Sequence, residues 1–329
     1  MQLRPAVPAI TVVVGFGASA HAAPLQYLTG AGARAQPVVW LTWGVLLISI
    51  TVVAVIAGLV LGGVLRRPVA DDGGLVPEKG GLSWLWIGVA LSAFVLLLTV
   101  IWTMRVLAQV QSPQTPPAVT IEVTGRQWWW QVRYLSDDPS RQFVTANEIH
   151  VPAGEPVRVR LVGGDVIHSF WVPQLAGKMD AVPGITNETW IEAAHPGIFR
   201  GQCTEYCGPQ HAHMALEVVA DAPQDFAAWW NHQLQSPPES GDDGRALFAA
   251  HCGGCHAVRG TEAVGALGPD LSHLMRRTTL ASGILPNNPA VLRQWIADPQ
   301  AFKPGSRMPT PQVSASELAR ITNWLETLE

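Results

Sequence analysis

Two long stretches without a charged side chain constrain the fold of this chain more than any other feature of its sequence. No Asp, Glu, Lys or Arg lies between Arg34 and Arg66, and none lies between Lys79 and Arg105. An α-helix needs about 20 consecutive apolar residues to cross the hydrocarbon core of a bilayer, and both stretches are longer than that. They predict a transmembrane hairpin within residues 24–110, to which two buried helices of a soluble core are the alternative.

The residues around these stretches predict how the hairpin lies in the membrane. The connecting loop carries Arg66, Arg67 and Lys79. Only Arg34 and Arg105 flank the outer ends. By this thin margin, the positive-inside rule places the loop in the cytoplasm of a bacterial cell and places both the N-terminus and everything after residue 110 on the periplasmic side of the inner membrane. Tryptophans toward the ends of both stretches fit the interfaces with membrane lipid: Trp40, Trp43, Trp84, Trp86 and Trp102.

Residues 1–23 have the pattern of a secretory signal peptide. Arg4 precedes a short apolar run over Ile10–Phe16, and small residues of the cleavage type follow at Ala18–Ala20. The run is short and interrupted by glycine, which argues against a third membrane span. A tail retained in the mature protein is the alternative.

The four cysteines fall into two pairs, and each pair belongs to a different metal-binding pattern. Cys203 and Cys207 are followed by His211 and Met214. Sulfur with imidazole favours copper, and two cysteines can bridge two ions where a mononuclear blue-copper site needs one. Each ion then needs a terminal imidazole, so a second histidine must come from elsewhere, and His168 is the candidate.

Two other interpretations use the same residues. A Cys₂His₂ zinc site would take both cysteines with His168 and His211, and a disulfide can form outside the cytosol. Zinc leaves Met214 without a role, and a disulfide leaves both His211 and Met214 without one. Copper is therefore the favoured prediction.

The second pair lies in Cys252–His256, which reads Cys-Gly-Gly-Cys-His and matches the motif of covalent c-type haem attachment. Cys252 and Cys255 would form two thioether bonds, and the imidazole of His256 would bind the iron. A redox dithiol or half of a zinc site are the alternatives. No βαβ pattern surrounds the motif and no further cysteine pair remains, so haem is favoured.

The sixth iron ligand is predicted to be a methionine. Met308 lies in the irregular loop Lys303–Pro309, whereas Met275 lies in Leu271–Arg277, a segment expected to be helical. Both are candidates, and the irregular loop of Met308 is able to fold over a haem edge. The remaining histidines match no ligand position, and those expected at the surface are His150, His195, His251 and His273.

Short apolar runs bounded by Gly and Pro predict an all-β sandwich over residues 111–222. The expected strands are Val119–Val123, Trp128–Tyr134, Glu148–Val151, Val157–Val162, Thr189–Ile191 and Leu216–Val219. A polar linker, 223–240, then leads to an all-α module, 241–329. Its expected helices are Gly244–His251, Pro289–Asp298 and Ser314–Leu328.

The spacing of the first donor set, Cys-x-Glu-x-Cys-x-x-x-His-x-x-Met, resembles the binuclear copper centre, CuA, of cytochrome c oxidase subunit II. The resemblance implies bridging thiolates from Cys203 and Cys207. It implies terminal imidazoles from His168 and His211 and a weak axial bond from Met214. Every ligand position of the family's pattern is filled.

This resemblance runs through most of residues 38–222 and implies the cupredoxin form of the sandwich, with a Greek-key strand order. It implies that Glu205 binds copper through its backbone carbonyl, while its carboxylate serves a magnesium site shared with subunit I. Gly125–Trp130 resembles the family's aromatic segment, in which Trp128 would be the residue where electrons enter from cytochrome c. A role in packing alone is the alternative for these tryptophans.

Residues 241–329 resemble a class I cytochrome c. Gly268–Leu271 matches the Gly-Pro-x-Leu turn of that family, and Met308 precedes a proline in a loop, as the distal methionine commonly does. The resemblance therefore favours Met308 as the sixth ligand and makes Met275 a core residue. His/Met ligation gives the higher reduction potential that suits an electron carrier.

No activated nucleophile, catalytic carboxylate pair or phosphate-binding loop accompanies the two centres, and both are one-electron carriers. The expected function is therefore that of subunit II of a haem–copper cytochrome c oxidase with a fused cytochrome c domain. Electrons would pass from a periplasmic cytochrome c or another donor through haem c and CuA to subunit I. In the family, subunit I reduces dioxygen to water and pumps protons, and subunit III is a further expected partner.

Two other functions use the same modules. The alternatives are the electron-entry subunit of a CuA-containing nitric oxide reductase and a membrane-tethered electron carrier without a fixed enzyme partner; the match that includes Glu205 argues against the second. The retained copper ligands exclude a quinol oxidase subunit. A net charge of −4 without a block of basic residues excludes nucleic acid as a partner.

Overall fold

A computed structural model of the chain describes residues 25–66, 81–237 and 242–329. The expected signal peptide, Arg67 and Lys79 of the connecting loop, and the end of the linker lie outside these described residues.

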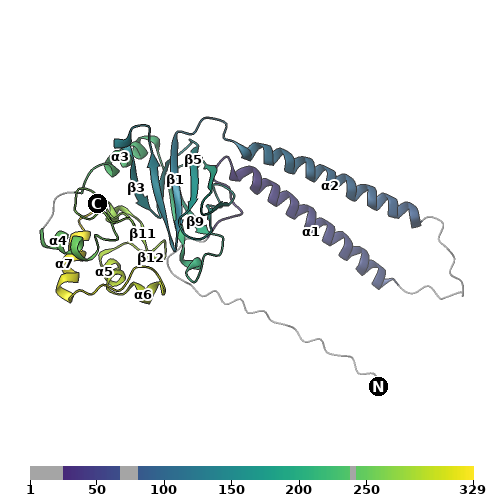
Figure 1. The fold of residues 1–329 in the computed structure, drawn as a ribbon. Helices are drawn as coiled ribbons and strands as arrows, with labels where there is room; N and C mark the ends of the chain where they lie inside the picture. The colour runs from purple at the N-terminus through teal and green to yellow at the C-terminus, as the bar shows by residue number, and fades with distance from the viewer. Residues whose placement is uncertain (1–24, 67–80, 238–241) are drawn as a thin grey trace, which may run out of the picture.

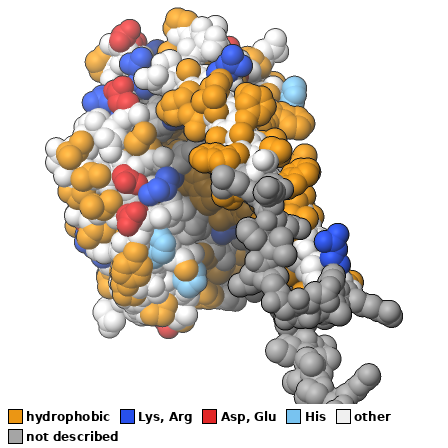
Figure 2. Space-filling model, turned by 90° about the vertical axis from the view of Figure 1, so that its right-hand side faces the viewer, with side chains coloured by type: hydrophobic (Ala, Val, Ile, Leu, Met, Phe, Trp, Pro, Cys, Tyr) orange, Lys and Arg blue, Asp and Glu red, His pale blue; other side chains and the backbone are white. Residues whose placement is uncertain are grey.

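The first two helices form an antiparallel hairpin that projects from one side of the molecule (Figure 1). Helix α1 spans Ala35–Leu65 and helix α2 spans Gly81–Gln111. Both are long and apolar enough to cross a membrane, with mean hydropathies of 2.8 and 2.4 over their most apolar windows. Their side chains are almost all exposed, and Figure 2 shows hydrophobic side chains gathered over this part of the molecule. An apolar surface of this extent needs lipid or other membrane helices to cover it.

The predicted β-sandwich is confirmed, and it consists of two sheets. The first has the strand order β3 (Phe143–Ala146), β2 (Trp129–Leu135), β1 (Val119–Arg126), β5 (Val157–Gly163) and β8 (Thr186–Ile191). The second has the order β4 (Glu148–Pro152), β10 (Ala215–Asp221), β9 (Gly197–Cys203), β6 (His168–Trp171) and β7 (Met179–Ala181). The parallel pairs β1–β5 and β4–β10 join strands that are distant in sequence, while the other neighbours are antiparallel.

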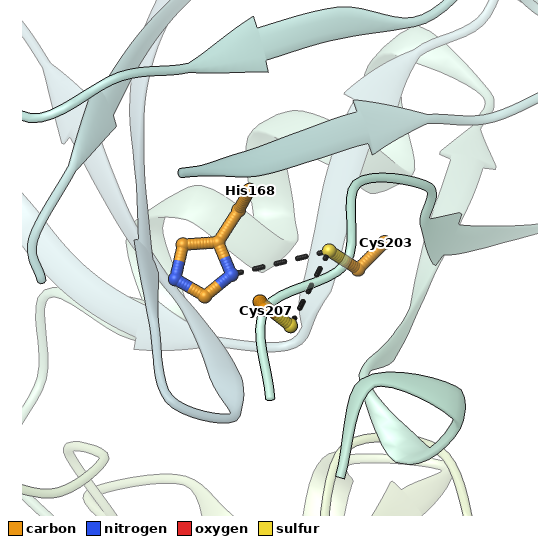
Figure 3. Close-up of side chains that lie close together, drawn as sticks. All are labelled: His168, Cys203 and Cys207. Carbon is orange, nitrogen blue, oxygen red and sulfur yellow. Dashed lines mark hydrogen bonds between the residues drawn. The ribbon is translucent and has the colours of Figure 1, made fainter. Parts of the chain in front are cut away.

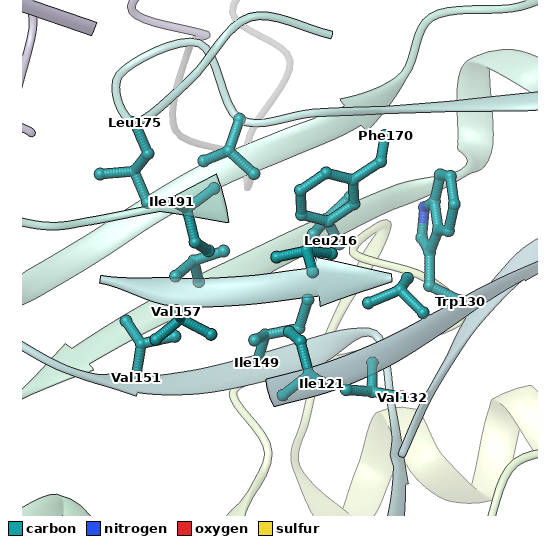
Figure 4. Packing of buried hydrophobic residues seen from close by; sticks show 14 of the residues in the cluster. Ile121, Trp130, Val132, Ile149, Val151, Val157, Phe170, Leu175, Ile191 and Leu216 are labelled. Atoms are coloured by element: carbon teal, nitrogen blue, oxygen red, sulfur yellow. The ribbon is translucent and has the colours of Figure 1, made fainter. Parts of the chain in front are cut away.

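The core lies between the two sheets, where alternate residues of each strand point inward (Figure 4). Ile121 of β1 and Val157 of β5 are fully buried, as are Phe170 of β6 and Leu216 of β10. Trp130 lies at one end of the core, beside the ring of His168, and its own ring is edge-on to Phe170 at a centroid distance of 5.9 Å. This packing gives the loops at that end a rigid base.

All six predicted strands are present, but β3, β6, β7 and β9 were not predicted. β9 contains two glycines, and β6 begins with His168 and Ser169, so neither shows an alternation of apolar and polar residues. These strands form because they pair with neighbouring strands, and the sequence of a single strand does not show with which strands it will pair.

The sandwich is fixed to the outer ends of the hairpin. The backbone N–H of Ala31, just before α1, donates to Gln174 O at 2.8 Å, and Arg34 donates to the carbonyl of Trp190 at 2.9 Å. The indole of Trp190 in turn donates to Val110 O, near the end of α2, at 3.2 Å. Both helix ends that face the sandwich are therefore tied to the same strand region.

The C-terminal module is helical, as predicted, and lies on the other side of the sandwich from the hairpin (Figure 1). Helix α3 (Pro223–Gln233) leads to it, and its helices are α4 (Asp242–His251), α5 (Pro289–Ala297), α6 (Pro299–Phe302) and α7 (Ala315–Leu325). Helices α4 and α7 cross closely at Gly244, where a Cβ would lie 2.5 Å from the Cβ of Trp324. Ser314 begins α7 with a capping box to Glu317.

This module differs from the all-α prediction in two details. A short hairpin, β11 (Thr279–Leu280) with β12 (Leu285–Pro286), projects toward the sandwich. The helix predicted over Leu271–Arg277 is a single 3₁₀ turn, Leu274–Arg276.

The surface predictions for His150 and His273 were wrong. His150 lies between two carboxylates, with Nδ1 2.6 Å from Asp221 and Nε2 3.1 Å from Glu148, and its ring stacks on Trp229 of α3. His273 is 4% exposed and its Nδ1 bonds the carbonyl of Glu329. Both are covered by elements that are remote in sequence. His195 and His251 are exposed, as predicted.

Candidate metal centres

The predicted copper ligands come from two neighbouring strands and the loop that follows them. His168 begins β6, Cys203 ends β9, and these strands pair directly, with Phe170 opposite Cys203. The loop then carries Cys207 and His211 and returns to β10 after Met214. A backbone hydrogen bond from Cys203 N to Met214 O, at 2.9 Å, holds the two ends of this copper loop together.

The six predicted donor atoms lie close together, and Figure 3 shows three of the residues that carry them, His168, Cys203 and Cys207. The Sγ atoms of Cys203 and Cys207 are 3.8 Å apart. Around Cys203 lie His168 Nδ1 at 3.9 Å and the carbonyl oxygen of Glu205 at 3.3 Å. Around Cys207 lie His211 Nδ1 at 3.5 Å and the Met214 Sδ at 3.9 Å.

This geometry discriminates between the interpretations of the motif. A disulfide needs sulfurs about 2.05 Å apart, and the two sulfurs are well beyond that distance. A tetrahedral zinc site uses four donors, whereas six converge here. Each imidazole lies beside a different sulfur, which fits one terminal imidazole for each of two ions bridged by both thiolates.

The two thiols share a strongly perturbed electrostatic environment. The pKa of Cys203 is lowered to about 4, because its sulfur contacts with Cys207 and then with His168 outweigh the effect of burial. The pKa of Cys207 is raised, because a second thiolate beside the first is unfavourable. Burial lowers the pKa of His168, but its bonds to Cys203 and Asp165 outweigh burial and raise it overall. Cationic metal would relieve the repulsion that keeps a proton on the second thiol.

Asp165, which the sequence reasoning missed, orients His168. Its Oδ1 lies 2.9 Å from His168 Nε2, so that Nδ1 faces the sulfurs. A carboxylate on the second nitrogen of a metal-binding histidine is a recurrent arrangement. Gly125 of β1 makes room for the same ring, since a Cβ there would lie 2.7 Å from it. The carboxylate three residues before the candidate histidine was the available signal.

Trp128 is in direct contact with the copper loop. Its indole N–H donates to the carbonyl of Cys207 at 2.9 Å, and the side chain of Gln127 donates to the same carbonyl at 2.8 Å. Trp128 is only 8% exposed and Trp130 is fully buried. Trp129 is half-buried and faces the guanidinium of Arg126. The three adjacent tryptophans therefore have three different environments.

The side chain of Glu205, the predicted magnesium ligand, is exposed at the surface. Its carboxylate is 45% exposed and lies 3.6 Å from the ammonium of Lys178. It is thus available to a partner surface, while its carbonyl faces Cys203.

The predicted haem residues lie in the C-terminal module, at and after the end of α4. Cys252 is half-buried and Cys255 is exposed. The Nδ1 of His256 donates to Pro269 O at 2.8 Å, which leaves Nε2 for a metal. Burial lowers the pKa of His256 and so favours the neutral imidazole that can bind iron. Gly268 lies against this ring, where a Cβ would be 2.6 Å from it.

The two methionines considered as the sixth ligand differ in their surroundings. Met308 lies in a loop without regular structure, and its carbonyl accepts a bond from Gln300 at 2.8 Å. Met275 lies in the 3₁₀ turn, and its N–H donates to Leu328 O at 2.9 Å. Both pack against the apolar core of the module.

Comparisons with known proteins agree with the two-module organisation. Residues 135–221 match the family model described as cytochrome c oxidase subunit II, periplasmic domain, and residues 241–329 match the cytochrome c model.

Two relatives are named cytochrome c oxidase subunit 2. That of Alkalihalophilus pseudofirmus is 36% identical over 296 residues, covering 86% of this chain and 83% of the relative. That of Bacillus sp. (strain PS3) is 30% identical over 271 residues, covering 77% and 75%. Among solved structures, the periplasmic domain of cytochrome oxidase subunit II of Bradyrhizobium japonicum is 36% identical and covers 36% of this chain and 95% of that domain, with a TM-score of 0.33.

Proposed function

The chain belongs to the cytochrome c oxidase subunit II family, and from this premise we propose that it carries electrons from a periplasmic donor to subunit I of a haem–copper oxidase. Its fused cytochrome c domain would receive each electron and its copper domain would deliver it. The observation that carries this proposal is the convergence of six donor groups around Cys203 and Cys207 in a chain that also holds a Cys-x-x-Cys-His motif.

We assign the copper ligands from the donors that meet at the loop. Cys203 and Cys207 would bridge the ions, His168 and His211 would be terminal ligands, and Met214 would bind weakly. Glu205 would add its carbonyl. When bound, such a centre supplies reversible one-electron transfer. The chain contributes burial, since Cys203, Cys207 and Met214 are at most 3% exposed, and a rigid sandwich that keeps the donors in place.

For the haem, we assign covalent attachment to Cys252 and Cys255 and axial ligation to His256 and Met308. The bond from His256 to Pro269 O fixes the ring orientation that presents Nε2. Trp128 is assigned as the residue where electrons enter the copper domain, because its indole bonds the peptide carbonyl of a copper ligand.

We further propose how the chain sits in its complex. Helices α1 and α2 would anchor it in lipid and against subunits I and III, with the N-terminus and both large domains on the periplasmic side. The carboxylate of Glu205 would contribute to a magnesium site shared with subunit I. Subunit I would then reduce dioxygen to water with proton pumping.

Replacement of the bridging thiolates tests the proposal. Cys203→Ser and Cys207→Ser are expected to abolish the near-infrared copper absorption and oxidase turnover, while the haem spectrum stays intact. Ser136→Ala, in the β2–β3 connection, is a control that contacts no proposed ligand. Zinc in place of two coppers per chain, or turnover that survives loss of the copper absorption, would refute the assignment.

A further inference from the structure

The cytochrome c domain is held against the copper domain by specific contacts. The tip of the β11–β12 hairpin (Ala281–Gly283) meets the start of β10, where Ala215 N donates to Ser282 O at 3.0 Å. The distal loop, Lys303–Met308, meets the copper loop, where Gln210 donates to Pro304 O at 2.7 Å. Figure 1 shows β11, β12 and α6 beside this end of the sandwich.

The carbonyl oxygen of Trp128 is the point where the contacts from the cytochrome c domain converge. Lys303 Nζ donates to it at 2.6 Å, and Ser282 Oγ donates to it at 2.8 Å. On its other side, Trp128 donates its indole N–H to the carbonyl of Cys207. One residue is thus bonded both to a proposed copper ligand and to two residues of the haem-binding module.

Lys303 is an unusual residue to find at such a junction. It is 4% exposed, and its Nζ donates only to the carbonyl oxygens of Trp128 and Ala281. Within the described residues, no carboxylate lies at ion-pair distance from it. Burial lowers its pKa to about 7. A buried ammonium without a carboxylate partner is costly, so its retention calls for a role.

Ser282 reaches Trp128 from a strained backbone. Ala281 and Ser282 have φ values of 51° and 65°, in the left-handed region that residues with a Cβ rarely adopt. Gly283 follows with φ 80°, and a Cβ there would lie 2.9 Å from the Cβ of Ala215. Strain of this kind persists where the surrounding contacts require it, and here those contacts are with the copper domain.

We propose that Lys303 and Ser282 are positioning residues that clamp the carbonyl of Trp128 and so dock the haem-bearing domain permanently on the copper loop. The inference rests on the proposed function, and it adds that Trp128 serves the haem of its own chain. The transfer so positioned moves one electron from reduced haem to the oxidised copper pair, without forming or breaking a bond. An external cytochrome c must then deliver its electron to the haem, since the docked domain covers Trp128.

The test uses the purified oxidase complex with three variants of the clamp. Lys303→Leu removes charge and donor, Lys303→Gln keeps a donor without the charge, and Ser282→Ala removes the hydroxyl. Arg320→Gln is the control, because Arg320 is exposed on α7 and pairs with Asp243 of its own module. Haem and copper spectra establish that each variant is folded and loaded.

Two measurements decide the outcome. Hydrogen exchange is followed at the amides of Ala215 and Thr278, which donate across the junction to Ser282 O and to Glu148. The haem-to-copper transfer rate is followed after rapid photoreduction of the haem. Loss of a hydrogen bond from a charged donor predicts that Lys303→Leu speeds the exchange, and slows the transfer, by about ten- to a hundredfold. Lys303→Gln and Ser282→Ala should give smaller changes in the same directions.

Unchanged exchange and unchanged transfer in Lys303→Leu and in the Lys303→Leu, Ser282→Ala double variant would overturn the proposal. So would faster exchange with an unchanged transfer rate, because docking would then not position the transfer. Failure of the proposed function is a different result, visible as missing copper or haem in the unaltered protein. The exchange measurement reports docking whether or not the metals are bound.

Discussion

Replacing Asp165 by Asn is the sharpest test of how the copper site is held, because both carboxylate oxygens are acceptors. Oδ1 accepts from His168 Nε2 at 2.9 Å and from Val166 N at 2.8 Å. Oδ2 accepts from Gln127 N at 2.8 Å and lies 3.4 Å from Arg307. The NH₂ of an asparagine must face donors on one side or the other. Either orientation abolishes a bond to His168 or to the backbone beside Trp128.

The size of the effect follows from these bonds. Leaving a part-buried donor without its acceptor costs about 1–3 kcal/mol, and loss of an outer partner of a metal-binding histidine lowers metal affinity by about 10–100-fold. We therefore expect Asp165→Asn to weaken copper binding by about 10–100-fold, with all proposed ligands still in place.

Competition with a chelator of known copper affinity measures this change, with the copper absorption as the signal. Asp138→Asn is a matched control, because Asp138 also accepts a backbone N–H, from Ser140 at 2.9 Å, but contacts no proposed ligand. Equal copper affinity and an identical copper spectrum in Asp165→Asn and the unaltered protein would refute the role assigned to this carboxylate.

Three further predictions address the haem, the response to pH and the packing of the site. Met308→Leu should abolish the methionine–iron absorption and lower the haem potential, whereas Met275→Leu should leave both unchanged; the opposite pattern would exchange the two assignments. Burial raises the pKa of Glu148, but bonds from His150 and Thr278 outweigh it and lower the pKa overall. Burial lowers the pKa of His150, but bonds to Asp221 and Glu148 outweigh it and raise the pKa overall. The Glu148 carboxylate therefore contributes to the free energy of unfolding at neutral pH, and this contribution is lost as pH falls through its lowered pKa. The contribution of the His150 imidazole is lost as pH rises through its raised pKa. The thermal midpoint should be highest between those values, and Glu148→Gln should flatten the acid side of a midpoint-against-pH curve. Gly125→Ala places a methyl 2.7 Å from the histidine ring of β6, and should lower both the thermal midpoint and the copper content; a copper content equal to that of the unaltered protein would show that the ring can move.

The sequence was most informative where function depends on closely spaced side chains. The donors from Cys203 to Met214 lie in one loop, and their spacing alone predicted a site at which the structure brings them together with His168. The hairpin was likewise predictable from its two long apolar stretches, and α7 from its amphipathic pattern and the serine at its start. In both cases, the relevant interactions are encoded within one continuous segment.

The contacts between domains left no such trace. Lys303 and Ser282 donate hydrogen bonds to a peptide carbonyl. Every residue has such a carbonyl, so no pattern of side chains in the sequence predicts this contact between the domains. His273 was wrongly expected at the surface, because the residues that cover it, Glu329 and His232 of α3, are far from it in the sequence. A polar residue becomes a core residue when another module packs on it, and only the assembled fold contains that information.

The contacts between the two domains predict that electron transfer from haem to copper and reduction of the haem by an external cytochrome c respond differently to salt. The central contacts between the domains end on the neutral carbonyls of Trp128, Ser282 and Pro304, which salt hardly screens. The ion pair between Arg307 and Asp165 lies at the rim, with Arg307 67% exposed, and pairs of this kind contribute little. Transfer from haem to copper within the chain should therefore keep its rate as ionic strength rises. Reduction of the haem by an external cytochrome c, which depends on charge steering, should slow under the same conditions. Photoreduction of the haem across a salt series isolates the first step, and stopped-flow mixing with reduced cytochrome c isolates the second. An internal rate that fell in parallel with the external one would mean that the cytochrome c domain detaches and rebinds through its charges during turnover, against the clamp at Trp128.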